Sequence, residues 1–121
     1  MSYQKIADLI WKLHEKTSQA KVKWEVTADE GVYQAIFAGY AIRISKKAAD
    51  IEPDIILQIY NEEGELIEEV NDREVTQVPE LPYNVYNIML NLYETARRIA
   101  MGTEQAINKI LDILGEDDIP F

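Results

Sequence analysis

The stretch KVKWEVTADEGVYQAIFAGYAIRIS, residues 21–45, decides the fold, because apolar and polar side chains alternate along it. An alternation of period two predicts β-strands with one buried face. Turn residues separate these strands at Asp29-Glu30-Gly31 and at Ala38-Gly39. The residues expected to face inward are Val22, Trp24, Val26, Tyr33, Ala35, Phe37, Tyr40, Ile42 and Ile44.

The two turns fix the register of the three strands. A two-residue turn at Ala38-Gly39 places Phe37 opposite Tyr40, and a four-residue loop places Val26 opposite Tyr33. All the inward residues then lie on the same face, which a shift of one residue would destroy. Ala-Gly is not the Asn-Gly that a tight hairpin favours, so a bulged, longer strand is the alternative.

Residues 54–70, DIILQIYNEEGELIEEV, predict a fourth and a fifth strand joined by residues 61–64. The fifth strand is rich in Glu, as expected for a sheet edge that must resist pairing with another chain. Residues 71–81 are expected to form the longest loop. The residues of this hairpin expected to face inward are Ile55, Leu57, Ile59, Leu66 and Val70.

Helical spacing of apolar residues marks both ends of the chain. A first helix is expected over residues 3–16, with Ser2 as its cap, and a second begins near Pro82. Gly102 ends the second helix and Thr103 caps the last. The expected buried residues are Ile6, Leu9, Ile10 and Leu13 in the first helix, Val85, Ile88, Met89, Leu92, Ala96 and Ile99 in the second, and Ala106, Ile107, Ile110, Leu111 and Leu114 in the last.

These elements predict a single α+β domain over residues 1–121. It consists of an antiparallel β-meander of four to five strands, with an N-terminal helix and two C-terminal helices packed on one face. Of the 121 residues, 47% are hydrophobic and 28% are charged, as in soluble globular proteins.

The composition also limits the location and chemistry of the protein. Cys is absent, which excludes thiol nucleophiles, disulfides and thiolate metal sites, and no cofactor is expected. No run approaches the roughly 18 apolar residues that a membrane span needs, and the charged N-terminal stretch is unlike a signal peptide. A cytoplasmic protein without membrane contact is therefore expected.

The net charge of −10 argues against nucleic acid as a partner, because phosphate binding depends on Lys and Arg. Residues 1–49 hold eight Lys/Arg and five Asp/Glu, a charge of +3, whereas residues 50–121 hold four and seventeen, a charge of −13. Such an asymmetry can orient an encounter or favour head-to-tail association. A solvated acidic face that maintains solubility is the alternative.

Catalytic motifs are missing from the sequence. His14 is the only histidine, and neither GxSxG nor HExxH is present. Carboxylates alternate in DIEPD, residues 50–54, but Ile55 and Asn61 stand where a calcium loop requires Gly and Glu. A P-loop and a GxGxxG motif are also missing. No catalytic residue and no metal ligand is predicted, and an enzyme is the least favoured class.

Two adjacent arginines end the second helix in LYETARRIAMGTEQAINKIL, residues 92–111. Both lie in the last turn, where a cation offsets the carbonyl end of the helix dipole. Arg98 follows Glu94 in the favourable i, i+4 order, and Arg97 lies beside Tyr93 on the flank of the buried stripe. The alternative role of Arg97 and Arg98 is to contact a small anion, because a guanidinium binds carboxylates.

The first helix has an apolar arc wider than one contact requires. Tyr3, Trp11 and His14 extend beyond its core-facing stripe. Trp and Tyr are favoured anchors of protein interfaces, and a Trp is costly to leave in water. These three residues are therefore predicted to contact a second chain, most simply in a two-fold homodimer. Packing by the final helices of the same chain is the alternative.

Three segments carry a resemblance to a known family: LHEKTSQAKVKWE at residues 13–25, YNEEGELIEEV at residues 60–70, and LYETARRIAMGTEQAINKIL at residues 92–111. Together they resemble a family of small uncharacterised bacterial proteins. The resemblance implies a bacterial origin and a single compact domain, and it brings no activity or catalytic residues with it.

The sequence thus favours a non-enzymatic interaction or adaptor module that acts as a homodimer or with a protein partner. Two other classes stay open. One is a binding module for a small anionic ligand, and the other is an acidic chaperone-type or immunity-type protein.

Overall fold

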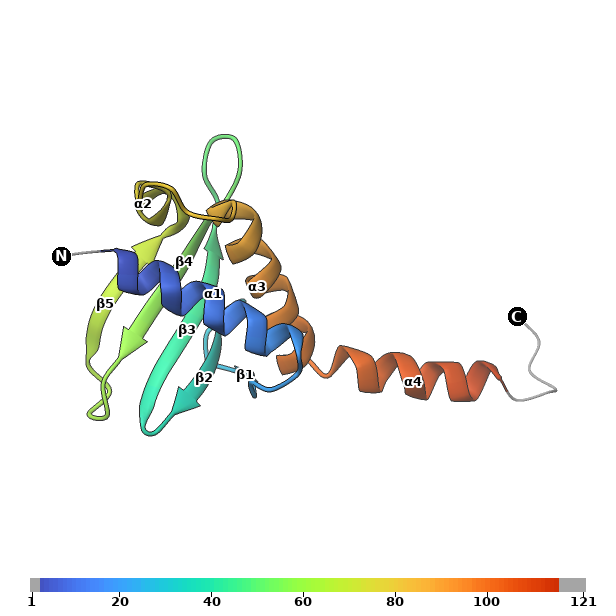
Figure 1. Ribbon diagram of the computed structural model, residues 1–121. Helices are drawn as coiled ribbons and strands as arrows, with labels where there is room; N and C mark the ends of the chain where they lie inside the picture. The colour runs from blue at the N-terminus through green and yellow to red at the C-terminus, as the bar shows by residue number, and fades with distance from the viewer. Residues whose placement is uncertain (1–2, 116–121) are drawn as a thin grey trace.

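A computed structural model describes residues 3–115 as two layers, a sheet and the helices that cover one of its faces (Figure 1). The antiparallel sheet has the strand order β1-β2-β3-β4-β5, and the expected α+β architecture is confirmed. Ser2, the expected cap of the first helix, lies outside the described residues. The elements are α1 (Gln4–Ser18), β1 (Glu25–Val26), β2 (Tyr33–Phe37), β3 (Tyr40–Lys47), β4 (Asp54–Tyr60), β5 (Leu66–Asn71), α2 (Asp72–Thr76), α3 (Val85–Ala100) and α4 (Thr103–Leu114).

The β2–β3 hairpin has the predicted register, in which Phe37 pairs with Tyr40. Ala38 and Gly39 have φ angles of 51° and 89°, so the tight two-residue turn forms and the bulged alternative does not. Phe37 and Tyr40 lie on the inner face at the turn end of the hairpin, where they stay partly exposed. The inner-face residues that are buried in this hairpin are Tyr33, Ala35, Ile42 and Ile44.

The first strand is shorter than predicted. Val26 pairs with Tyr33 as expected, but only Glu25 and Val26 form β1. Trp24 is buried outside the strand, and its indole Nε1 donates a hydrogen bond to Thr17 Oγ1 at 3.0 Å. Val26 is 54% exposed at the sheet edge, so its expected burial is wrong. The indole contact with α1 draws the chain before Glu25 away from a regular strand.

A β-bulge between Ile59 and Tyr60 changes the expected register of β5. Leu57 pairs with Val70, and both are buried. The bulge places Leu66 opposite Tyr60, and Leu66 is exposed. The predicted burial is therefore confirmed for Val70 and wrong for Leu66.

A short helix, α2, replaces the first part of the loop that was expected at residues 71–81. The Asn71 side chain accepts a hydrogen bond from the backbone N–H of Glu74 at 2.9 Å. The Glu74 carboxylate in turn accepts one from the backbone N–H of Asn71 at 3.0 Å. This reciprocal pair is a capping box, which begins the helix immediately after β5.

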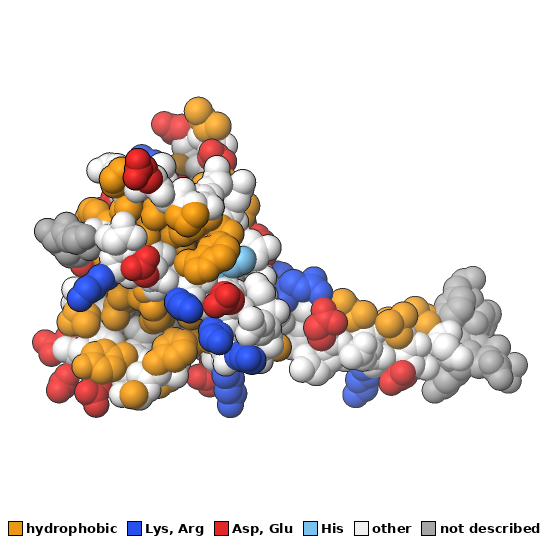
Figure 2. Space-filling view, in the orientation of Figure 1, with side chains coloured by type: hydrophobic (Ala, Val, Ile, Leu, Met, Phe, Trp, Pro, Cys, Tyr) orange, Lys and Arg blue, Asp and Glu red, His pale blue; other side chains and the backbone are white. Residues whose placement is uncertain are grey.

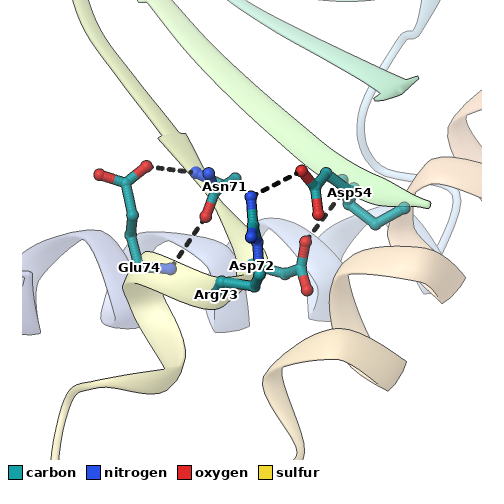
Figure 3. A network of polar contacts seen from close by, with 6 residues as sticks. Asp54, Asn71, Asp72, Arg73 and Glu74 are labelled. Atoms are coloured by element: carbon teal, nitrogen blue, oxygen red, sulfur yellow. Dashed lines mark hydrogen bonds and ion pairs between the residues drawn. The ribbon is translucent and has the colours of Figure 1, made fainter. Parts of the chain in front are cut away.

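Two further contacts join α2 to the start of β4 (Figure 3). The buried carboxylate of Asp72 accepts a hydrogen bond from the backbone N–H of Ile55 at 2.9 Å. The Arg73 guanidinium contacts Asp54 Oδ2 at 2.9 Å. The acidic residues at this end of the sheet therefore hold α2 in place.

Helices α1 and α3 lie side by side on the same face of the sheet and share one hydrophobic core with it. Met89 and Leu92 on α3 are fully buried. α3 begins at Val85 rather than near Pro82, because the Asn84 side chain caps its first turn with a hydrogen bond of 2.9 Å.

The last helix, α4, projects away from the domain (Figure 1). Gly102 ends α3 with a φ of 66°, as predicted, but it also takes the N-cap position of α4 that was expected of Thr103. Across this junction, Arg98 Nη2 contacts Glu104 Oε1 at 2.7 Å. These features direct α4 away from the sheet, so the expected burial is wrong for Ala106, Ile107, Ile110, Leu111 and Leu114.

Candidate functional site

Helix α4 carries an apolar face that no other part of the described chain covers. Its large hydrophobic side chains are between 40% and 58% exposed, and Figure 2 shows such side chains along the helix. At 100° per residue they occupy roughly 160° of the circumference, more than the stripe of about 100° that faces a single surface. The residues of this face are Ile107, Ile110, Leu111, Ile113 and Leu114.

A second uncovered apolar surface is a groove between α1 and the turn end of the β2–β3 hairpin, with a volume of about 410 Å³. Leu9 and Leu13 of α1 form one wall. Phe37 and Tyr40 are 40% and 44% exposed within it, because α1 crosses the sheet without covering the hairpin end. The groove is therefore the uncovered continuation of the core. Its other apolar lining residues are Val22, Ile42 and Ile59.

Lysines complete the lining of this groove, which is called the α1 groove below. Lys12, Lys16 and Lys21 are all exposed. Lys12 Nζ lies 3.9 Å from Glu15 Oε1, a distance typical of a weak surface pair. Lysines and hydrophobic side chains are neighbours on this side of the molecule (Figure 2). An apolar floor with a cationic rim is complementary to an apolar segment that carries negative charge.

The structure assigns Arg98 to the junction between α3 and α4. Its partner is Glu104 at 2.7 Å, and not Glu94 as expected. Glu94 Oε1 lies instead 3.6 Å from Lys46 Nζ. Arg98 therefore helps to orient α4 as well as finishing α3.

Arg97 lines a separate cavity of about 400 Å³, next to Tyr33 and Tyr93. Asp29 and Glu30 line the same cavity, and their carboxylates oppose the binding of an anion there. An anion contact by Arg97 and Arg98 stays a prediction.

The three residues predicted to form a partner interface on α1 all have contacts within the chain. The Tyr3 hydroxyl donates to a carboxylate of α2 at 3.1 Å. Trp11 stacks on Tyr83 with ring centroids 5.4 Å apart, yet it stays 41% exposed. His14 Nε2 lies 3.0 Å from Asn91 Oδ1 on α3. Helix α2, Tyr83 and helix α3 thus contact this arc. Its contact with a second chain stays a prediction.

A group of metal ligands and a membrane-spanning helix are both absent from residues 3–115. No group of three or more His, Asp or Glu side chains in this part of the chain could hold a metal ion. No helix in the same range is long and apolar enough to cross a membrane.

Comparison of the chain with protein-family models, curated proteins and solved structures gives no match. The function is therefore argued from the surfaces themselves. Sequence reasoning identified the apolar spacing of α4 correctly but assigned that face to the core. The α1 groove was missed because the inward residues of the hairpin were assumed to be covered by the helices.

Proposed function

We propose that this protein is a non-enzymatic interaction module that associates through α4, most simply with a second copy of itself. One observation carries the proposal: α4 has no buried residue although five of its twelve residues are large and apolar. An isolated helix of this length is only marginally stable in water. Because full burial of an Ile or Leu side chain contributes about 1.5–3 kcal/mol, a partner for this face would stabilise both the helix and the complex.

A matched pair of substitutions on α4 tests the proposal. Ile110→Glu places a charge on the apolar face, whereas Asn108→Glu places the same charge about 160° away around the helix. Analytical ultracentrifugation is expected to show a dimer for the wild type and for Asn108→Glu, and a monomer for Ile110→Glu. A wild-type chain that remains monomeric at every concentration would contradict the proposed self-association.

A further inference from the structure

We infer that the α1 groove receives α4 of a second copy, and that two copies exchange these helices reciprocally in a two-fold dimer. The inference rests on the proposed function and names the surface that α4 contacts. It accounts with one association for two apolar surfaces that residues 3–115 leave uncovered.

The apolar face of α4 is wider than the contact that one packed helix would make. A helix of the length of α4 is about 18 Å long, and its apolar face extends over roughly 160° of the circumference. A groove contacts a helix on its floor and its walls, whereas a second helix contacts only a narrow stripe. In the α1 groove, Leu9 and Leu13 form the wall, and Phe37 and Tyr40 lie at its sheet side.

The charges of the two surfaces are also complementary. Lys12, Lys16 and Lys21 line the groove. Residues 103–118, which begin with α4, contain five acidic residues and one lysine, a net charge of −4, and Glu104 borders the apolar face next to Leu111. Two α4 helices packed on each other would bring these acidic groups together. The charge pattern therefore favours the groove over a pair of α4 helices.

The junction with α3 favours exchange between copies over folding back within one copy. Gly102 has a left-handed backbone, Arg98 contacts Glu104 at 2.7 Å, and the Met101 N–H donates to the Arg97 carbonyl at 2.9 Å. A reversal of α4 onto its own domain would break the contact between Arg98 and Glu104. The extended direction in Figure 1 leaves the apolar face of α4 available to another copy.

The base of α4 also lies close to the groove. Val22 lines the α1 groove and also lines the cavity that Arg98, Glu104 and Gln105 form at the start of α4. In the inferred dimer, a two-fold axis relates the two domains, and each α4 lies against the groove of the other copy. Such an interface is isologous and closes at two copies.

Neighbouring residues on β2 provide a matched test of the groove. Phe37→Glu puts a charge on the floor of the groove, whereas Ile36→Glu puts one on the opposite face of the same strand, where Ile36 is 50% exposed. Sedimentation equilibrium is expected to show a dissociation constant at least a hundredfold higher for Phe37→Glu and little changed for Ile36→Glu. Circular dichroism checks that both variants fold. The double variant Lys16→Glu/Lys21→Glu provides the same test without changing the floor, because it alters only exposed residues at the rim. Its dissociation constant is expected to be about tenfold higher than that of the wild type.

A mixture of two variants separates this arrangement from its alternatives. Phe37→Glu retains a normal α4 and Ile110→Glu retains a normal groove, so an equimolar mixture is expected to form a heterodimer with one intact contact. If the folded groove variants remain as dimeric as the wild type while Ile110→Glu is monomeric, the groove is not the receptor, although the proposed function stands. A monomeric wild type overturns both.

Isotope-filtered NMR on a mixture of labelled and unlabelled wild-type chains identifies the occupant directly. Contacts between the methyl groups of Ile110 or Leu111 in one copy and the rings of Phe37 or Tyr40 in the other are expected. The same contacts within a monomer would show that α4 closes on its own groove, and contacts between two α4 helices would show that they pair. Either result overturns the exchange.

Discussion

At the scale of single residues, the pairing of the strands forces the backbone of Ala38 into a conformation that costs free energy. The pairing of Phe37 with Tyr40 leaves only Ala38 and Gly39 to reverse the chain. A type I′ turn needs a positive φ at both positions, and the two φ angles here are 51° and 89°. For an alanine, a left-handed conformation costs roughly 1–2 kcal/mol.

Ala38→Asn should therefore stabilise the protein, because Asn tolerates the left-handed conformation and Asn-Gly is the favoured pair in this turn. An increase of about 1 kcal/mol in the free energy of unfolding is expected, measured by urea denaturation. Ala49→Asn, at an exposed loop position without a positive φ, is the control and should change it by less than about 0.5 kcal/mol. Equal effects of the two substitutions would contradict the assignment of strain to Ala38.

Tyr83 connects the segment before α3 to α1. Its hydroxyl donates to the Ala7 carbonyl at 2.8 Å, and its ring stacks on Trp11. Burial raises the pKa of the Tyr83 phenol above its ordinary value, and the Asp8 carboxylate raises it further. The unfolded chain therefore releases this proton at a lower pH than the folded chain does.

This pKa shift gives the Tyr83 hydroxyl a pH-dependent effect on stability. Its contribution is complete below the unfolded pKa of about 10 and is lost as the pH rises through the higher folded pKa. At about pH 8, Tyr83→Phe should lower the free energy of unfolding by about 0.5–1.5 kcal/mol, the usual effect of one hydrogen bond. The difference from the wild type should narrow by about pH 11 in urea denaturation. A difference that is the same at both pH values would show that the phenol ionises equally in the two states.

At the scale of the elements, α2 depends on its capping box more than on the ion pair beside it. Asn71→Ala removes the side chain that accepts the Glu74 N–H, and the loss of such a cap costs about 1 kcal/mol. Arg73→Ala removes a contact with Asp54 from a guanidinium that is 71% exposed, and the expected cost is below about 0.5 kcal/mol. Thermal and urea unfolding of the two variants would measure this ranking. A larger loss of stability for Arg73→Ala than for Asn71→Ala would contradict it.

The strands could be predicted from the sequence because alternation and turn residues are local signals. The pairing of Phe37 with Tyr40 followed from Ala38-Gly39 alone, and the structure confirms it. The capping box at residues 71–74 was also a local signal, and it could have revealed α2. The exposure of Leu66 could not be predicted, because the bulge in β4–β5 pairing depends on contacts across the sheet.

Local sequence signals predict the position of α4 even less well. Its apolar spacing indicates a helix with one buried face, and that spacing is the same whether the covering surface belongs to the same chain or to another. The direction of the helix depends on Gly102 and on the contact of Arg98 with Glu104. The sequence therefore indicated that the face needs a cover, but not which surface provides it.

At the scale of the whole molecule, two effects of charge oppose each other in the inferred dimer. Each copy has a net charge of −10, which disfavours association at long range. The lysines of the α1 groove and the acidic residues of segment 103–118 attract each other locally. Salt screens both effects, so the salt dependence of the wild type alone cannot separate them.

Two triple variants with the same net charge of −13 do separate them, since each replaces three lysines by glutamine in a chain of net charge −10. One replaces the groove lysines, Lys12, Lys16 and Lys21, and the other replaces Lys5, Lys23 and Lys47, which do not line the groove. At an ionic strength of about 0.05 M, the dissociation constant of the groove variant should exceed that of the control by about tenfold, equivalent to about 1.4 kcal/mol over three exposed pairs. Near 0.5 M, where the Debye length is only a few ångströms, sedimentation equilibrium should show the two constants converging. Equal constants at low salt would contradict a contact between the groove lysines and the acidic segment 103–118, because the two variants have the same net charge and differ only in which lysines are replaced.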